Sequence, residues 1–248
     1  MPRLSVILIT KNEAANIRAC LESVAWADEI VVVDSGSTDG TLQIVREFTA
    51  RVYVHVDWPG FGPQKNRALD YATGDWVLSL DADERVTPEL RAEIEAVLAA
   101  PQAEGYWIAR RSSFCGRFMR HSGWYPDHVL RLFRRDAGRF SDALVHEAVQ
   151  LKGRTAHLRQ ALLHYPYRDL RDVLAKLDSY STAAAVQLQQ RGKRGGLARA
   201  LLHGLWAFIR TYFLRAGFLD GREGFMLAVM NAENSYYRYI KLWLMQNR

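Results

Sequence analysis

The chain has 248 residues, of which 49% are hydrophobic, so it can bury a sizeable core and is not disordered. Its two cysteines, Cys20 and Cys115, form no C-x-x-C pair, which excludes a disulfide framework and indicates a reducing compartment. The formal net charge of +6 indicates an anionic partner but does not distinguish nucleic acid, phospholipid and phosphorylated substrate. The apolar run near the N-terminus is too short for a signal peptide, so we expect a cytoplasmic location.

The first half of the chain alternates apolar runs with amphipathic segments, a pattern typical of β-α units around a mainly parallel sheet. Asn12 is predicted to cap the first helix, and Thr87 with Pro88 to open a later helix that runs to about Leu98. The predicted strands of this half cover residues 4–9, 30–33, 52–56 and 76–80.

The second half changes character twice. Shorter predicted strands between residues 105 and 164 indicate that the sheet becomes mixed, and the pattern beyond Asp169 is helical almost to the end. We therefore predict an α/β fold with a catalytic domain over residues 1–168 and a helical tail over residues 169–248.

Polar residues follow three of the first four predicted strands. They are Thr10-Lys11-Asn12-Glu13, then Asp34 with Ser37 and Asp39, and then Asp81 with Asp83. Any one of these sets alone is explained by caps and turns. In an open α/β sheet, however, ligands bind outside the carboxyl ends of the strands, and the three sets together indicate a binding site there.

The pair Asp81-Ala82-Asp83 directly follows an apolar strand and is the sharpest local feature. Carboxylates and diphosphate oxygens are the ligands that Mg²⁺ or Mn²⁺ prefers, and such an ion stabilises the charge on a departing nucleoside diphosphate. Neither G-x-G-x-x-G after the first strand nor a P-loop motif occurs, which disfavours a dinucleotide oxidoreductase or P-loop NTPase. Side chains must then hold the nucleotide, with Lys65 or Arg67 as the diphosphate contact.

Taken together, these stretches resemble glycosyltransferase family 2, which has the GT-A fold. The matching segments, in the correct order, are residues 5–13, 31–41, 65–68 and 74–84. The resemblance implies a nucleotide pocket, a metal held through the diphosphate by Asp83, and inversion at the anomeric carbon. The candidate nucleotide-sugar-binding residues are Thr10, Asn12, Glu13, Asp34, Ser37, Lys65 and Asp81. This chain has Gln64-Lys65-Asn66 where many members have Ala-Arg-Asn, so it offers the diphosphate a point charge and not a bidentate fork.

A one-step inverting displacement needs a general base on the acceptor hydroxyl. Asp127 occupies about the position where family members carry the base, and Glu147 is its rival. The alternatives are a turn residue after proline for Asp127 and an exposed strand carboxylate for Glu147. His146 is a candidate metal ligand beside Asp81 and Asp83, and His164 is a weaker candidate.

The segment Arg131 to Arg134, the segment Val145 to Glu147 and the helical tail look like the small cytoplasmic transferases that extend the lipopolysaccharide inner core. That resemblance implies a lipid-linked saccharide as acceptor and UDP-glucose as the default donor. A polyprenyl-phosphate sugar transferase, which often has spanning helices, and an inactive nucleotide-sugar sensor are the alternatives. A nucleic-acid-binding module is disfavoured, because the predicted pocket is acidic and the cations gather in the tail.

The most apolar part of the tail, Leu201 to Leu219, contains His203, Arg210 and Arg215 and is too polar to span a bilayer. It predicts an amphipathic, aromatic-rich helix surrounded by basic residues. We expect peripheral attachment to the anionic surface of the inner membrane. The alternative is that the aromatic residues pack against the catalytic domain or against a second copy of the chain in a homo-oligomer.

Overall fold

The structure is a computed structural model that describes residues 2–142 and 148–247. The chain divides into two compact units. The first unit combines Met1–Arg110 with Asp127–His164, and the second combines Arg111–Pro126 with Tyr165–Arg248. The sequence-based division at residue 168 assigned residues 111–126 to the catalytic domain, because their strand-like pattern does not reveal that they pack with the helices of the tail.

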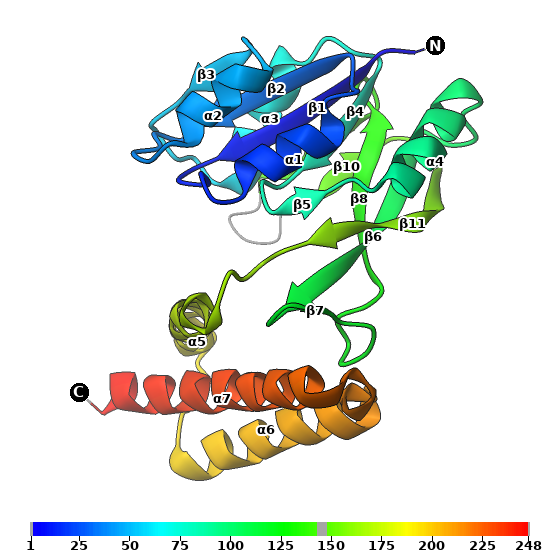
Figure 1. Cartoon of the computed structure of the whole chain (residues 1–248). Helices are drawn as coiled ribbons and strands as arrows, with labels where there is room; N and C mark the ends of the chain where they lie inside the picture. The colour runs from blue at the N-terminus through cyan, green and yellow to red at the C-terminus, as the bar shows by residue number, and fades with distance from the viewer. Residues whose placement is uncertain (1, 143–147, 248) are drawn as a thin grey trace. The chain divides into compact units, whose positions relative to one another are not determined.

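A twisted mixed sheet forms the centre of the first unit (Figure 1). Its strands follow the order β3-β2-β1-β4-β8-β6-β11-β5. The first four are parallel: β1 (Leu4–Thr10), β2 (Glu29–Asp34), β3 (Val52–Val54) and β4 (Trp76–Leu80). The others are β5 (Glu84–Arg85), β6 (Gly105–Phe114), β8 (Asp127–Arg134) and β11 (Thr155–His164). Because β8 runs antiparallel to both β4 and β6, the sheet is mixed, as the sequence predicts.

Helices cover both faces of the parallel half (Figure 1). One face packs against α1 (Ile17–Val24) and α2 (Thr41–Phe48), and α4 (Pro88–Ala99) extends the same apolar core over β11 in the mixed half. The other packs against α3 (Phe61–Tyr71) and β9 (Gly138–Phe140), which pairs with β10 (Val149–Leu151). Burial on both faces explains why β2 and β4 are buried along their whole length and read as continuous apolar runs.

The predicted helix starts have different outcomes. Thr87 caps α4 by accepting the backbone N–H of Leu90 at 3.2 Å, with Pro88 at the first helical position, as predicted. The prediction that Asn12 caps α1 is wrong, because the helix begins at Ile17 and Asn16 occupies the cap position. Asn12 instead has a left-handed φ of 57°, and its side-chain oxygen accepts the N–H of Thr38 at 2.8 Å.

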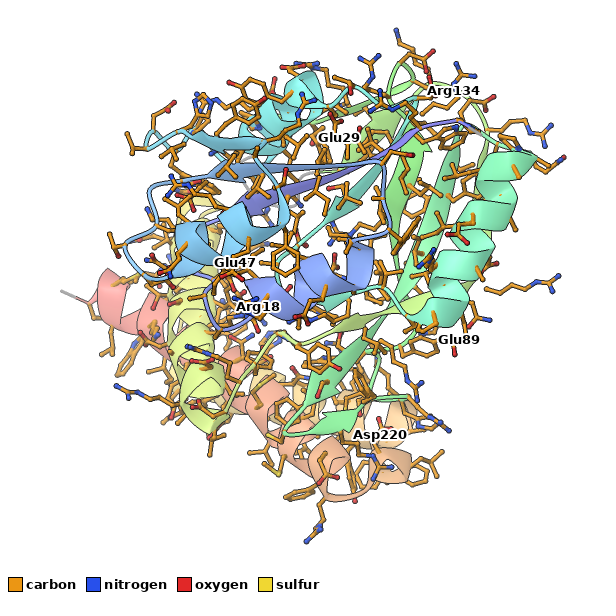
Figure 2. The ribbon with its side chains drawn as sticks, turned by 45° about the horizontal axis from the view of Figure 1, so that its top comes forward. Arg18, Glu29, Glu47, Glu89, Arg134 and Asp220 are labelled. Atoms are coloured by element: carbon orange, nitrogen blue, oxygen red, sulfur yellow. The ribbon has the colours of Figure 1, made fainter. Side chains whose placement is uncertain are left out.

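Polar contacts tie the amino ends of the parallel strands together. The carboxylate of Glu29 accepts the N–H of Thr73 at 2.8 Å and also contacts the Ser5 hydroxyl and the Arg51 guanidinium. At the surface, Arg18 of α1 pairs with Glu47 of α2 at 2.8 Å, and Figure 2 labels these two side chains and Glu29. The buried contacts hold the edge of the sheet opposite to the carboxyl ends of the strands.

The second unit is mainly helical. It contains β7 (Arg117–Phe118), α5 (Leu170–Gln190), α6 (Leu197–Ile209) and α7 (Gly221–Gln246), with short π and 3₁₀ turns at 210–214 and 217–220. Its core is built around Phe114, Met119, Val173 and Leu227. The continuous helix predicted over 201–219 is broken, because Ala216 adopts a left-handed φ of 52°. Within the part of the chain that the structure describes, no helix combines the length and the apolar character needed to cross a membrane.

Candidate active site

The carboxyl ends of β1 and β2 bring three of the candidate binding residues together. Asp34 is buried, and its Oδ2 accepts the hydroxyls of Thr10 at 3.0 Å and Ser37 at 2.5 Å. Its Oδ1 accepts the N–H groups of Gly36 at 2.9 Å and Ser37 at 2.8 Å. Gly36 has a left-handed φ of 80°, which lets the turn fold back onto the carboxylate. Asp34 is therefore held rigidly at the end of its strand.

The loops that follow these two strands are cross-linked. The backbone N–H of Asn12 donates to the Ser37 hydroxyl at 2.8 Å, and that of Glu13 donates to the Thr41 hydroxyl at 2.8 Å. The Glu13 carboxylate accepts the side-chain amide of Asn16 at 2.9 Å. These bonds give the edge of the sheet a fixed shape, with both loops side by side.

A cavity of about 370 Å³ opens beside this edge. It is lined by Ile9, Thr10, Lys11, Glu13, Trp58 and Phe61. The Trp58 and Phe61 rings meet edge to face at 4.9 Å and are 46% and 47% exposed, so they offer aromatic surface of the kind that suits base stacking. Neither ring was among the site residues predicted from the sequence; the available signal was the presence of two aromatic residues in a Gly/Pro-rich stretch.

Asp81 follows β4 and is held by two cations. Its Oδ1 lies 3.1 Å from Lys65 Nζ of α3, and its Oδ2 accepts the Arg131 guanidinium of β8. Removal from water would by itself raise the pKa of Asp81, but the charges and hydrogen bonds of Arg131 and Lys65 outweigh it and hold the pKa well below its usual range. Arg67, the other candidate for the diphosphate, instead forms a bidentate pair with Asp57.

Asp83 lies close to His164, the weaker of the two histidine candidates. Its Oδ2 is 3.5 Å from Nε2 of His164, which ends β11, and the two side chains are 22% and 15% exposed. Within 2–142 and 148–247 no cluster of three or more His, Cys, Asp or Glu side chains is arranged to hold a metal. His146 and Glu147 lie outside the described residues.

This donor set suits a hard divalent ion that also binds substrate. Asp83 offers carboxylate oxygen and His164 imidazole nitrogen, and one or two protein ligands suffice when a diphosphate supplies the rest. Asp81 fits less well as a direct ligand, because both its oxygens already contact cations. The residues present therefore fit Mg²⁺ or Mn²⁺ through Asp83.

Asp127, the candidate base, opens β8. Its Oδ2 accepts Nε and Nη2 of Arg110 at 2.9 and 2.5 Å, and its side chain is 45% exposed. Arg110 lies opposite Asp127 in the β6–β8 pairing, so the register of the sheet places the two together. Enough of the carboxylate faces solvent to meet a hydroxyl group.

A second cavity, of about 280 Å³, lies among these charged residues. Its lining includes Lys65, Asp81, Trp107, Arg110, Arg131 and Phe140. The side-chain amide of Asn66 donates to the backbone carbonyl of Phe140 and accepts its backbone N–H, each at 2.9 Å. Charged donors beside aromatic faces suit a saccharide, which presents hydroxyl groups and apolar C–H faces together.

The parallel strands, the acidic turn after β4 and the helices on both faces define a glycosyltransferase of the GT-A type. The family model described as Glycosyl transferase family 2 matches residues 5–151. The chain belongs to glycosyltransferase family 2.

Relatives along nearly the whole chain support the assignment. The lipopolysaccharide core biosynthesis glycosyltransferase LpsC of Rhizobium meliloti (strain 1021) is 32% identical, over 95% of this chain and 93% of the relative. An uncharacterized glycosyltransferase of Rickettsia felis is 30% identical, over 98% of this chain and 90% of the relative. Among solved structures, S. aureus TarS 1-349 aligns with a TM-score of 0.50 and 19% identity, over 99% of this chain and 92% of that chain, which shows the fold.

Proposed function

We propose that this chain is an inverting, metal-dependent glycosyltransferase that moves glucose from UDP-glucose onto a lipid-linked saccharide of the lipopolysaccharide inner-core class. The observation that carries the proposal is the acidic turn Asp81-Ala82-Asp83 at the carboxyl edge of a sheet whose neighbouring strand ends carry Thr10 and Asp34. The acceptor class is supported by the likeness to LpsC along nearly the full length of both chains.

The nucleotide end of the donor fits the cavity beside Thr10 and Glu13. The Trp58 and Phe61 rings provide stacking surface for the base, and the strand-end polar groups meet base or ribose. Lys65, already beside Asp81, supplies positive charge for the diphosphate.

Asp83 with His164 would hold the divalent cation. When bound, Mg²⁺ or Mn²⁺ stabilises the negative charge that develops on the departing diphosphate. In the other half of the reaction, Asp127 accepts the proton of the acceptor hydroxyl. The oxygen of that hydroxyl bonds to the anomeric carbon, and the C–O bond between the anomeric carbon and the diphosphate breaks. Arg110 orients that carboxylate.

The decisive experiment measures nucleotide release from UDP- and GDP-sugars with Mg²⁺ or Mn²⁺ and truncated lipopolysaccharide. We expect consumption of one sugar only when metal and acceptor are both present. Asp83→Asn should lower turnover by about 10²-fold or more, because a metal-bound charge stabilises the transition state by several kcal/mol. The matched control is Asp70→Asn, since Asp70 is 56% exposed and pairs with Arg139.

The outcomes separate the alternatives. Turnover with polyprenyl phosphate but not with lipopolysaccharide would identify the chain as a polyprenyl-phosphate sugar transferase. Nucleotide binding without turnover on any acceptor would favour the nucleotide-sugar sensor. An Asp83→Asn variant as active as wild type would contradict the metal assignment.

We further propose that the second unit attaches to an anionic membrane surface at the cytoplasmic face of the inner membrane. Nine large apolar side chains of α6 and the turns after it are exposed: Leu197, Leu201, Leu202, Leu205, Trp206, Phe213, Leu214, Phe218 and Leu219. The exposed cations Arg199, Arg210 and Arg215 come from the same stretch, and exposed Arg222 follows it at the start of α7. An apolar surface accompanied by cations suits an anionic leaflet better than a purely apolar partner.

A further inference from the structure

A buried cation connects the acidic turn to the rest of the sheet. Arg131 lies on β8, one residue from Leu132, which pairs with Leu78 of β4, so the register of these strands places its side chain beside the turn that follows β4. The Arg131 side chain is 5% exposed. Its Nη2 contacts two carboxylates, those of Asp81 and Glu84, the latter at 2.6 Å. In the sequence, both Arg131 and Glu84 stand out only as members of segments that resemble other transferases.

Glu84 also closes the turn from within. Its side chain is completely buried, and its Oε2 accepts the backbone N–H of Asp81 at 3.0 Å. The backbone N–H of Glu84 in turn donates to the carbonyl oxygen of Asp81 at 3.0 Å. Glu84 therefore fixes the backbone of Asp81, and Arg131 fixes its carboxylate. We call Arg131 and Glu84 the clamp.

If the clamp served stability alone, its burial would cost folding free energy. Burying an arginine between carboxylates carries a large desolvation penalty, and apolar residues of similar size often stabilise a fold at least as well. Nε of Arg131 has no hydrogen-bond partner among the described residues, which adds to that cost. Arg131 lines the 280 Å³ cavity together with Asp81, so one member of the clamp forms part of the wall of a site.

We propose that Arg131 is a positioning residue for glycosyl transfer, which with Glu84 holds the Asp81 carboxylate in the orientation that the nucleotide-sugar requires. The proposal rests on the proposed function. In this proposal Arg131 acts through Asp81, whose carboxylate Lys65 also contacts at 3.1 Å. The substitution Arg131→Lys keeps the positive charge, but an ammonium group does not reproduce the planar guanidinium that contacts both carboxylates.

The first test compares Arg131→Lys with Arg134→Lys, a matched change at an exposed arginine on the same strand. For each, the measurements are the melting temperature, the dissociation constant for UDP by calorimetry, and donor KM and kcat. We expect Arg131→Lys to raise the dissociation constant and donor KM by about tenfold, with a smaller change in kcat, as removal of a group that orients a ligand does. Arg134→Lys should change neither.

A second variant, Arg131→Met with Glu84→Leu, separates positioning from stability. It replaces the buried pair by apolar side chains, so we expect only a modest fall in melting temperature, caused by the backbone N–H of Asp81 that loses its acceptor, while UDP affinity and donor KM remain impaired. Wild-type UDP affinity in this double variant, or in a folded Arg131→Lys variant, would overturn the clamp. A wild-type protein that binds no nucleotide at all would instead contradict the proposed function, and with it the role of the clamp.

Discussion

Single carboxylates in the first unit have distinct tasks because their neighbours differ. Asp34 is satisfied entirely by hydroxyl and backbone donors, Asp81 by two cations, and Asp83 lies beside an imidazole. Asp127 keeps 45% of its side chain exposed although Arg110 holds one of its oxygens. From residue type alone, these four aspartates could not be told apart.

The role of Asp127 leads to a kinetic prediction. Asp127→Asn removes the proton acceptor but preserves size, so we expect kcat to fall by about 10²- to 10⁴-fold while donor KM changes little. Steady-state kinetics with varied donor and acceptor would show this. Arg110→Lys, which keeps a positive charge beside Asp127, should have the smaller effect. Full activity of Asp127→Asn would transfer the role to Glu147, the rival candidate.

The environment of Glu29 predicts that its contribution to stability depends on pH. Burial alone would raise its pKa, but hydrogen bonds from Ser5 and Thr73 and the Arg51 charge outweigh burial and lower the pKa from 4.5. A carboxylate with a depressed folded-state pKa stabilises the fold above its unfolded-state pKa, and this contribution is lost as the pH falls through the folded-state pKa. We expect Glu29→Gln to cost about 1–3 kcal/mol at pH 7, a difference that shrinks below about pH 4.5.

Urea unfolding at a series of pH values would measure that difference. Glu47→Gln is the control, because Glu47 is 48% exposed in a surface pair with Arg18 (Figure 2) and should cost no more than about 0.5 kcal/mol. A cost for Glu29→Gln that does not vary with pH would show that packing, and not charge, is what Glu29 contributes.

At the scale of elements, the sheet sets which loops become a site. β1 lies between β2 and β4, so the loops that follow all three strands meet at one edge. The helices then fill the two faces, and α3 delivers Lys65 to Asp81 from one side while β8 delivers Arg131 from the next strand. The binding residues thus come from elements that are distant in sequence.

The start of α4 offers a test of local structure. Thr87 accepts the N–H of Leu90 at 3.2 Å, so Thr87→Ala should destabilise the first unit by about 1 kcal/mol through loss of the cap. Chemical unfolding would report the change, and Thr87→Ser, which keeps the hydroxyl, should recover most of it. An alanine variant as stable as wild type would mean that Pro88 and the buried face of α4 suffice to start the helix.

At the scale of the whole molecule, the exposed apolar surface of the second unit leads to a binding prediction. We expect the full chain to co-sediment with vesicles containing phosphatidylglycerol, and Leu202→Asp with Leu205→Asp to weaken binding by about tenfold or more, since each places charge on an apolar surface. Raising the salt concentration should also weaken binding, because the basic residues act through screened charge.

Val56→Asp is the control for that experiment, as Val56 is a 76% exposed apolar residue of the first unit. No binding to anionic vesicles at low salt would contradict membrane attachment. Concentration-dependent dimers in analytical ultracentrifugation, abolished by the same two aspartates, would show that a second copy of the chain covers this surface instead.

The sequence by itself determined the α/β class, the parallel strands, the cap at Thr87 and the acidic turn, because apolar period, turn chemistry and motif order are local properties. It also placed Thr10, Asp34 and Ser37 at strand ends, and the structure brings them together. Only the tertiary structure decided that Asn12 does not cap α1, that residues 111–126 join the tail, and that Arg131 and His164 reach the acidic turn. These outcomes depend on strand register and on packing between distant segments, which no local pattern records.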